Sequence, residues 1–316
     1  MAGLRLLLLA TAEFSAPTLS ALSKGPDDVL GVVTRPDRPA GRGRRLRAPP
    51  MKLAAQELGL PVFQPQRVSS PAGLELLRSL APGVLFVVAF GEVLSEAVLA
   101  VPHLGAINLH ASLLPRYRGA APIQRALLAG ETMTGVSVQW MVKELDAGDI
   151  LLQRALSVGE EEDFGSLHDR LAQLGADAAV EAVALLRRGE APRQRQDSEH
   201  ASYAPPIRRE ELVVDWRRPA NEIARQVRAF SPRPGARTSR GGKLLKLLAV
   251  REVGMEGQER GMPGRVTELT GEGFWVGAGE GRLLILRVQP EGGRVLSGGE
   301  YAQGYRLEQG EVLGTV

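Results

Sequence analysis

Cysteine is absent from the 316-residue chain, which excludes disulfide bonds and zinc sites built on thiolates. A cysteine-free chain is by default expected in the cytoplasm. No apolar run approaches the ~20 residues that a membrane-spanning helix needs. The apolar residues 4–10 could pass for the core of a signal segment, but residues 11–14 after them show no small-residue cleavage pattern. We therefore predict that residues 4–10 form a buried first strand.

Lysine is scarce, with five in the whole chain, so arginine carries almost all the positive charge. The formal net charge is only +3, but its distribution is uneven. Residues 35–47 hold six arginines against the single acid Asp37, and residues 207–246 hold eleven Lys or Arg against four acids. One such cluster could equally be a solvated face, but two of them, one in a Gly/Pro-rich loop, favour contact with a phosphate backbone.

Several common catalytic signatures are missing. The chain has no Gly-x-Ser-x-Gly elbow, no phosphate-binding P-loop and no His-Glu-x-x-His pair. Residues 41–43, Gly-Arg-Gly, lack the third glycine of a dinucleotide fingerprint. The four histidines are scattered without the spacing of metal ligands, so we predict no metal site.

The first 190 residues alternate short apolar runs with helical patterns. Strands that are apolar on both faces and separated by helices indicate a parallel sheet covered on both sides. We expect strands at 4–10, 29–34, 84–89 and 106–110, and helices at 15–24, 51–58, 73–80 and 122–129. An antiparallel pair at 136–142 and 150–158 and a long helix at 164–188 complete the predicted domain, a doubly wound, Rossmann-like α/β unit over residues 1–190.

The remainder of the chain changes character. Residues 191–206 are polar, hold three prolines and lack periodicity, which indicates a linker. After a helical stretch at 221–230, short strands separated by Gly-rich turns follow at 244–250, 264–269, 274–276 and 283–289. This spacing predicts a small C-terminal β-barrel over residues 207–316, with an oligonucleotide-binding (OB-like) fold as the leading candidate.

The chemistry concentrates around the end of the strand at 106–110. Asn108 and His110 are two residues apart, so their side chains face the same side of that strand. The carboxyl ends of strands in an open parallel sheet line the ligand crevice. Asp146 follows on a tight turn before Gly148. An amide, an imidazole and a carboxylate suit acyl transfer to an amine, so Asn108, His110 and Asp146 are the candidate catalytic residues.

The residues beside this set allow more than one interpretation. Ser112 could contact a ligand through its hydroxyl, or could serve as a turn residue bonded to the local backbone. Arg116, Tyr117 and Arg118 lie on a Pro/Gly-containing loop, where they could hold a phosphate or ribose, or could be solvated. Asp149 suits a structural role in the turn.

These motifs resemble those of the folate-dependent formyltransferases. The superfamily pattern is Asn108-x-His110, followed by Ser112-Leu113-Leu114-Pro115 and by the turn at Asp146. A narrower branch that formylates an aminoacyl-tRNA is indicated by residues 34–43 (Thr-Arg-Pro-Asp-Arg-Pro-Ala-Gly-Arg-Gly), by residues 118–124 (Arg-Gly-Ala-Ala-Pro-Ile-Gln) and by Asp215-Trp216. The likeness covers essentially the full length.

The resemblance implies 10-formyltetrahydrofolate as the formyl donor and the methionine α-amine of a charged initiator tRNA as the acceptor. It places the donor against residues 87–92 and 112–115, and the barrel against the tRNA. The implied donor contacts are Phe90, Gly91, Ser112, Leu113, Leu114 and Pro115, and the implied tRNA contacts are Arg42, Arg44 and Arg45. The chain departs from the usual family pattern at residues 10–14 and at Pro206 and Arg233, which stand where a lysine and a tryptophan are common.

Two alternatives remain at the level of sequence. The same catalytic domain could use another acceptor, such as a nucleotide-linked sugar amine or a purine-pathway amine; the basic loop at 35–47 and the second domain argue against this. The chain could also be an RNA-binding protein with an inactive catalytic domain, against which the intact Asn108, His110 and Asp146 argue.

Overall fold

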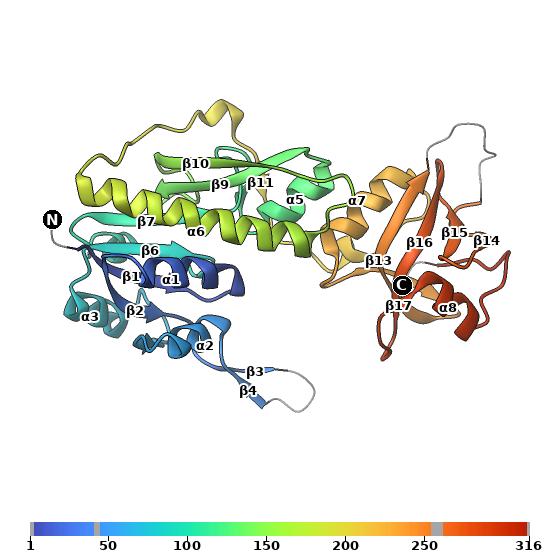
Figure 1. The fold of residues 1–316 in the computed structure, drawn as a ribbon, viewed down its shortest axis with the longest axis horizontal. Coiled ribbons are helices and arrows are strands. Elements are labelled where there is room, and N and C mark those ends of the chain that lie inside the picture. Colours follow the sequence, from blue (N-terminus) through green and yellow to red (C-terminus); the bar gives the residue numbers. More distant parts are fainter. Residues whose placement is uncertain (1–2, 41–44, 254–261, 315–316) are drawn as a thin grey trace. The chain divides into compact units, whose positions relative to one another are not determined.

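The computed structural model describes residues 3–40, 45–253 and 262–314, and these form two compact units (Figure 1). The first unit holds the described chain up to Ala204, apart from two excursions. The second unit holds the chain from Pro205 onward together with those excursions, Ile123–Thr132 and Val158–Leu167. The predicted domain limits at residues 190 and 207 stay a prediction.

A seven-stranded sheet in the order β10-β9-β7-β6-β1-β2-β5 is the centre of the first unit. Its first five strands in the chain run parallel, and β9 and β10 add an antiparallel edge beside β7. The strand order reverses between β1 and β6, which is where ligands bind in open α/β sheets. The strands are β1 (Arg5–Ala10), β2 (Asp28–Val33), β5 (Val62–Phe63), β6 (Val84–Val88), β7 (Gly105–His110), β9 (Met133–Trp140) and β10 (Ile150–Ser157).

Shorter elements surround this sheet. The ribbon of β3 (Arg38–Ala40) and β4 (Arg45–Arg47) projects from it, and β8 (Arg118–Gly119) pairs in parallel with β11 (Tyr203–Ala204). Helix α3 begins where sequence rules favour it, because the Ser70 hydroxyl accepts a hydrogen bond from Gly73 N and Pro71 opens the helix. The helices are α1 (Ala16–Ser23), α2 (Pro50–Glu57), α3 (Pro71–Leu80), α4 (Glu96–Leu99) and α6 (Phe164–Arg188), with 3₁₀ turns η1 (Glu13–Ser15) and η2 (Ser198–His200).

The predicted first strand is a central strand of the core. Leu6, Leu7, Leu8 and Leu9 of β1 are all completely buried, as are Val32 and Val33 of β2. Full burial of one such side chain contributes roughly 1.5–3 kcal/mol. A strand buried on both faces must be apolar at every position, which explains why this segment reads as a continuous run.

Helix α6 fixes which face of β7 is free for chemistry. A Cβ atom on Gly175 of α6 would lie 2.7 Å from Cδ2 of Leu109, so the helix packs directly on that leucine. Leu109 is therefore on the helix-covered face of β7. Because side chains alternate along a strand, Asn108 and His110 point to the opposite face.

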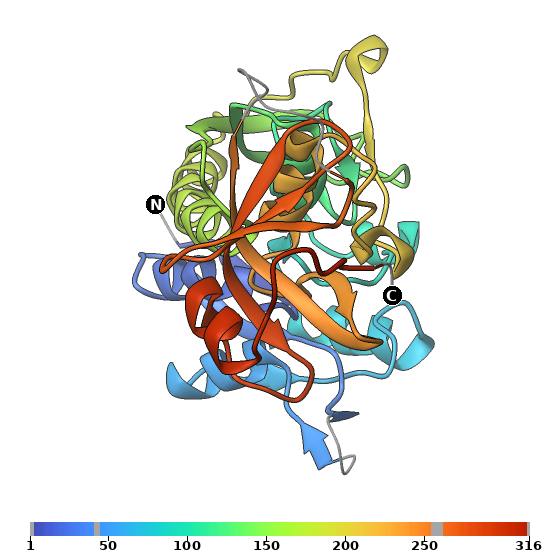
Figure 2. The same ribbon diagram turned by 90° about the vertical axis from the view of Figure 1, so that its right-hand side faces the viewer.

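The second unit is built on an antiparallel sheet in the order β12-β13-β16-β15-β14, which Figure 2 views from the front. Bridges from Ser239 to Gly314 and from Arg265 to Val312 tie both ends of this order to the C-terminal segment, giving a barrel-like closure. Helix α7 buries Ile223, Val227 and Phe230 at helical spacing. The elements are α5 (Pro122–Ala129), η3 (Glu210–Leu212), α7 (Ala220–Phe230), β12 (Ala236–Arg240), β13 (Lys243–Val253), β14 (Val266–Leu269), β15 (Phe274–Gly277), β16 (Arg282–Pro290), β17 (Leu296–Ser297) and α8 (Gly298–Gly304).

The predicted fold class, a doubly wound α/β domain followed by a small antiparallel β unit, is confirmed. The motif Asp215-Trp216 lies at the start of the second unit. Trp216 is buried, and its indole Nε1 donates to the Thr238 hydroxyl at 3.0 Å, which in turn donates to Gly314 O at 2.7 Å. The motif therefore anchors the start of this unit to β12 and to the chain's last described residue.

Candidate active site

Asn108 and His110 lie together at the carboxyl end of β7, on the face opposite α6. In the neighbouring antiparallel strand β9, Asn108 pairs with Gln139 and His110 pairs with Ser137. Directly opposed residues share a face, so four polar side chains line this part of the sheet. His110 is 7% exposed and Asn108 is half-buried. Among the described residues, the Asn108 amide has no hydrogen-bond partner and is free to meet a ligand.

The two nitrogens of the His110 ring have different surroundings. Nε2 lies 2.9 Å from the backbone carbonyl of Tyr117, and a carbonyl oxygen can only accept, so Nε2 carries a hydrogen. Nδ1 lies 3.6 Å from Oδ2 of Asp146. In the neutral ring Nδ1 is therefore the nitrogen without a hydrogen, and it lies beside the Asp146 carboxylate.

Asp146 is held on a strained turn. Its backbone has a positive φ of 51°, and a Cβ on the following Gly148 would come within 1.7 Å of Trp140 O, so only glycine fits there. Both carboxylate oxygens accept hydrogen bonds. Oδ2 accepts from Gly119 N at 2.9 Å, and Oδ1 accepts from Gln139 Nε2 at 3.0 Å. These two donors aim the carboxylate at His110.

Two polar residues of β9 belong to the site and were missed from the sequence. Gln139 is 2% exposed and Ser137 is completely buried. The signal was present, because Val136, Ser137, Val138 and Gln139 alternate apolar and polar within an otherwise apolar strand. A buried strand with two polar residues on one face indicates that this face meets a polar structure.

Arg118 and Gln196 form a second buried pair that sequence reasoning did not foresee. Both are 6% exposed, and the guanidinium donates from Nε and Nη2 to Gln196 Oε1 at 3.1 and 2.7 Å. The Gln196 amide donates to the backbone carbonyls of Asp146 and Gly148 at 2.9 and 2.7 Å. Arg118 is thus neither solvated nor aimed at an open phosphate site, although its loop position had left both uses open.

The segment from Ser112 to Pro115 lies beside this site and is tied to β9. The Ser112 hydroxyl donates to Arg116 O at 2.6 Å, as a turn residue does. Ser137 donates to Ser112 O and accepts from Leu114 N. Ser112 and Leu114 are buried. The predicted donor contacts of residues 112–115 stay a prediction.

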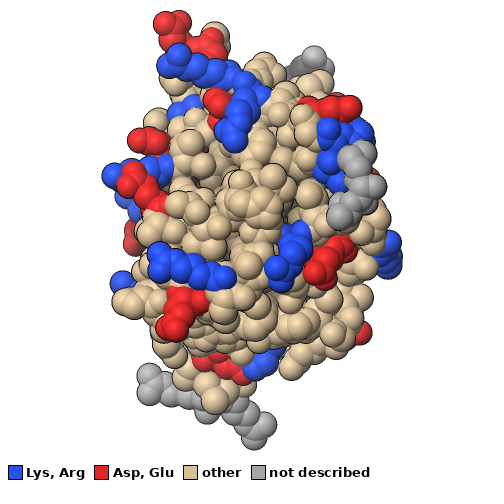
Figure 3. Space-filling model, turned by 90° about the vertical axis from the view of Figure 1, so that its left-hand side faces the viewer, with Lys and Arg blue, Asp and Glu red and all other residues tan. Residues whose placement is uncertain are grey.

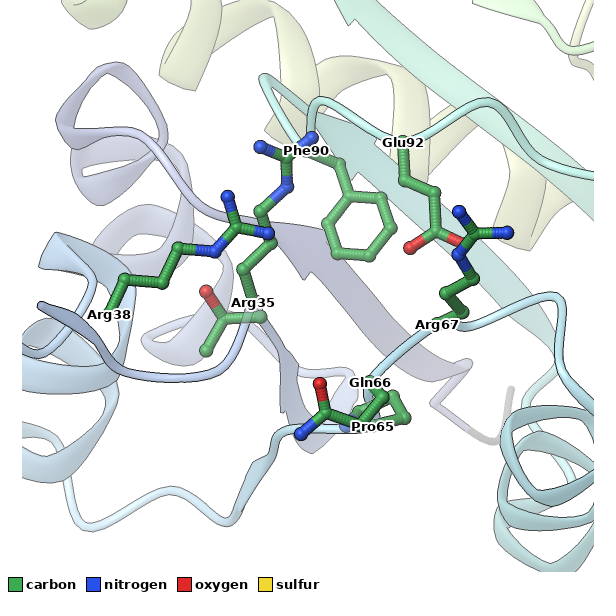
Figure 4. Close-up of a pocket in the computed structure, with 8 residues that line it drawn as sticks. Arg35, Arg38, Pro65, Gln66, Arg67, Phe90 and Glu92 are labelled. Atoms are coloured by element: carbon green, nitrogen blue, oxygen red, sulfur yellow. The ribbon is translucent and has the colours of Figure 1, made fainter.

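A pocket of about 320 Å³ opens at the carboxyl ends of β2, β5 and β6. Its size is at the lower limit for small-molecule sites. Figure 4 shows the Phe90 ring between Arg35 and Arg38 on one side and Glu92 and Arg67 on the other. Predicted Phe90 therefore lines a pocket, and neighbouring Gly91 (φ 76°) is covered by Arg35, since a Cβ there would lie 2.9 Å from Nη2. The lining residues are Thr34, Arg35, Arg38, Pro65, Gln66, Arg67, Phe90 and Glu92.

The basic loop at 35–47 is described only in part. Arg42 and Arg44 lie outside the described residues, and only the backbone of Arg45 is described, in β4. On the face that Figure 3 shows, Lys and Arg are interspersed with Asp and Glu and do not form one patch. Over the described part of the chain, no group of three His, Cys, Asp or Glu could hold a metal ion, and no helix is long and apolar enough to cross a membrane.

Comparison with known proteins assigns both units. Residues 4–183 match the family described as "Formyl transferase", and residues 206–306 match "Formyl transferase, C-terminal domain". The methionyl-tRNA formyltransferase of Geobacter sulfurreducens is 46% identical over 314 residues, covering 99% of this chain and 98% of that protein. The protein of the same name from Moorella thermoacetica is 47% identical over 313 residues, covering 99% of this chain and 100% of that protein.

Solved structures share the fold at low identity. An N-formyltransferase from Helicobacter canadensis, bound to folinic acid and dTDP-3-aminofucose, has a TM-score of 0.68 at 15% identity, covering 89% of this chain and 98% of that chain. HypX from Aquifex aeolicus, bound to tetrahydrofolic acid, has a TM-score of 0.66 at 18% identity, covering 95% of this chain and 48% of that chain. Fold and site thus define a formyl transferase. At the identities found over its full length, the chain belongs to the methionyl-tRNA formyltransferase family.

Proposed function

We propose that this chain transfers the formyl group of 10-formyltetrahydrofolate to the α-amine of methionyl-initiator tRNA, in the cytoplasm, for translation initiation. The observation that carries the chemistry is the His110 ring, which keeps Nε2 on the Tyr117 carbonyl and leaves Nδ1 for proton exchange 3.6 Å from Asp146. Membership in the methionyl-tRNA formyltransferase family supports the acceptor.

Asn108 acts on the oxygen of the formyl group. When the amine nitrogen attacks the formyl carbon, the carbonyl oxygen gains negative charge, and a positioned amide N–H stabilises it. The Asn108 amide suits this role because it has no partner of its own among the described residues and lies two residues from His110 on the same strand face. Once His110 has taken the proton of the amine, its ring places positive charge beside the same oxygen.

His110 and Asp146 handle the proton. A free α-amine has a pKa of ~7.7–8.0, so much of it is neutral near pH 7 and only a modest base is needed. After attack, Nδ1 of His110 takes a proton from the amine nitrogen, and the Asp146 carboxylate stabilises the imidazolium. The bond between the formyl carbon and N10 of the folate then breaks, and Nδ1 of His110 gives its proton to N10, which restores the neutral ring.

The donor site is proposed at the carboxyl ends of β6 and β7. Support comes from Phe90 in the pocket, and from folate compounds in the Helicobacter canadensis and Aquifex aeolicus structures that share this fold. Phe90 and Gly91 would face the donor from β6, and Ser112, Leu113, Leu114 and Pro115 from the segment after β7.

The acceptor is proposed to contact both parts of the chain. Residues 1–190 would carry catalysis, residues 191–206 would connect, and residues 207–316 would hold the tRNA. The basic cluster at 35–47, with Arg42, Arg44 and Arg45, would contact the acceptor end, because this segment gathers six arginines against one acid and positive charge suits a phosphate backbone.

Single-turnover formylation tests this proposal. The protein is incubated with 10-formyltetrahydrofolate and, in separate reactions, with methionyl-initiator tRNA, a nucleotide-linked amino sugar, or a purine-pathway amine. The proposal predicts transfer to the tRNA alone. Efficient transfer to either small amine would overturn the acceptor, and binding of tRNA with no transfer to any acceptor would overturn the enzymatic function.

A further inference from the structure

The segment between α6 and the second unit returns to the catalytic residues. Residues 191–204, here called the return segment, follow α6 and belong to the first unit. Gln194 forms an antiparallel bridge with Ile150 of β10, and Pro192 O accepts from Trp140 Nε1 at 2.9 Å. The guanidinium of Arg193 lies 3.8 Å from the centre of the Trp140 ring. The return segment is thus packed against the edge of the sheet that carries the site.

Gln196 of the return segment holds the turn of Asp146. It contacts two carbonyls of that turn through Nε2 and the buried Arg118 guanidinium through Oε1. The amide has only one orientation that fits, because guanidinium groups only donate and carbonyls only accept. Replacing it leaves a buried cation and two carbonyls without their partner, which costs far more than one surface hydrogen bond.

Ser202, also in the return segment, holds the backbone that binds Nε2 of His110. Its hydroxyl accepts from Tyr117 N at 2.9 Å, and its carbonyl accepts from Arg118 N at 2.8 Å. Tyr117 has a positive φ of 61°, an unusual conformation for a residue with a side chain. Its carbonyl is the group that fixes Nε2 of His110. In the strand pair β8–β11, Ala204 of the return segment pairs with Gly119. The N–H of Gly119 donates to Asp146 Oδ2.

From these contacts we propose that Gln196 and Ser202 are positioning residues for the proposed formyl transfer. Ser202 sets the Tyr117 carbonyl that selects the His110 tautomer, and Gln196, with Arg118, sets the turn that presents the Asp146 carboxylate to Nδ1. Both act through other residues and touch neither donor nor acceptor. This inference rests on the proposed function, since it assigns the proton step to His110 and Asp146.

Replacing Gln196 or Ser202 should lower kcat and leave the KM for the donor nearly unchanged. A displacement of about 1 Å in a reacting group can cost on the order of 10²-fold in rate. Gln196→Leu keeps the approximate volume and removes every hydrogen bond, so we expect kcat to fall ~10- to 100-fold with KM for the donor changed less than about twofold. Ser202→Ala acts in the same direction, and Ser202→Thr, which keeps the hydroxyl, restores most of the rate.

The second unit offers a matched control. Gln226 is 4% exposed and also holds two backbone carbonyls, those of Glu211 and Val213, at 2.8 and 3.0 Å. Gln226→Leu therefore removes a buried amide that also bonds two backbone carbonyls, but away from the site. We expect both Gln226→Leu and Gln196→Leu to lower the unfolding free energy, and the loss to be larger for Gln196→Leu because it also leaves Arg118 without its partner. Only Gln196→Leu should lower kcat.

The experiment combines kcat and KM with NMR of ¹⁵N-histidine, which is practical because the chain has four histidines. In the unaltered protein the His110 signal, assigned by its loss in His110→Gln, should report a single Nε2–H tautomer. In Gln196→Leu or Ser202→Ala the signal should shift or split, and in Gln226→Leu it should not. An unchanged His110 signal together with unchanged kcat, or equal kcat losses in Gln196→Leu and Gln226→Leu, would overturn the positioning role. Full activity of His110→Gln would overturn the proposed function. The His110 NMR signal in the Gln196 and Ser202 variants would still show whether these two residues hold the ring.

Discussion

Oδ2 of Asp146 lies 3.6 Å from Nδ1 of His110, while Nε2 of the same ring is bound to a backbone carbonyl. In a serine-protease triad the carboxylate holds one ring nitrogen and leaves the other to the nucleophilic serine. Here a backbone carbonyl binds one ring nitrogen, and the carboxylate lies beside the other, which is the nitrogen that we propose exchanges a proton. In the proposed mechanism the Tyr117 carbonyl therefore orients the ring, and Asp146 stabilises the imidazolium.

Replacing His110 by alanine should lower kcat by ~10²–10⁴-fold, which is the usual contribution of a positioned acid or base. The ring is buried but bound to only one carbonyl, so the variant should remain folded. Circular dichroism and single-turnover formylation check both parts. Turnover within a few-fold of the unaltered protein, in a folded His110 variant, would remove the ring from the mechanism.

Removing the amide in Asn108→Ala should lower kcat by on the order of 10²–10³-fold, because one oxyanion donor is lost. The amide has no described partner to lose, so the unfolding free energy should change little. Equilibrium donor binding, followed by the fluorescence of a folate analogue, should stay within about twofold. A variant that loses donor affinity and keeps its kcat would show that Asn108 binds the donor and does not act on the transition state.

Asp146→Asn should lower turnover by about 10²-fold or more with little change in donor affinity. In the unaltered protein Gly119 N–H and the Gln139 amide both donate to the carboxylate of Asp146. The NH₂ group of asparagine cannot accept, so one of these two hydrogen bonds is lost. The negative charge beside Nδ1 is lost as well. Rate and donor affinity are measured together. Normal turnover at saturation with a weakened donor complex would assign Asp146 to donor binding.

Stability of the second unit should depend on pH through Glu211. Hydrogen bonds from Arg125 lower the pKa of Glu211 from 4.5 to about 2. A folded-state pKa below the unfolded value means that the unfolded chain binds more protons, so the stabilisation is present above about pH 5 and is lost as pH falls toward 2. With the pair only partly buried, its size is on the order of 1–3 kcal/mol.

Urea unfolding of Glu211→Gln checks this. The unaltered protein should exceed the variant in unfolding free energy at pH 6, and more than half of that difference should disappear by pH 3. The exposed neighbour Glu210 provides the control, since Glu210→Gln should have little effect at either pH. A difference between the unaltered protein and Glu211→Gln that is the same at both pH values would contradict the role of the Arg125 pair.

The triple replacement of Arg42, Arg44 and Arg45 by alanine should weaken binding of charged tRNA and flatten its salt dependence, because fewer counterions are released. Donor binding should be unaffected. Affinities measured between about 50 and 200 mM salt give the slope. An unchanged slope and affinity would make this loop a solvated feature and leave tRNA contact to the C-terminal unit.

Strongly periodic parts of the fold could be predicted from sequence, and locally ambiguous parts could not. Helices α5 and α6 occur at the predicted residues, and six of the seven strands of the first sheet begin and end within three residues of prediction. The two-residue strand β5 was not predicted. Strand β12 was missed because its five residues, Ala-Arg-Thr-Ser-Arg, are mostly polar, and burial of Ala236 and Thr238 comes only from the folded barrel. Helix α8 was missed because it is short and glycine-rich, although Ser297 and Glu300 form a capping box.

At the site, the local pattern predicted which residues meet but not what holds them. The i, i+2 spacing of Asn108 and His110 placed both on one face, and the Asp146 turn lies beside them. The partnership of Arg118 with Gln196 joins residues 78 positions apart and could not be read from composition, because a polar, proline-containing stretch looks the same whether it is free or packed. Only the fold shows that the stretch containing Gln196 returns to the catalytic turn.

The central claim is formyl transfer to a methionyl initiator tRNA through Asn108, His110 and Asp146. The most direct measurement is the rate of formylation of methionyl-initiator tRNA against methionyl-elongator tRNA, with 10-formyltetrahydrofolate, for the unaltered protein and for His110→Ala. The account predicts rapid transfer to the initiator alone, reduced ~10²-fold or more in His110→Ala. Equal formylation of both tRNAs, or transfer that survives the loss of His110, would contradict it.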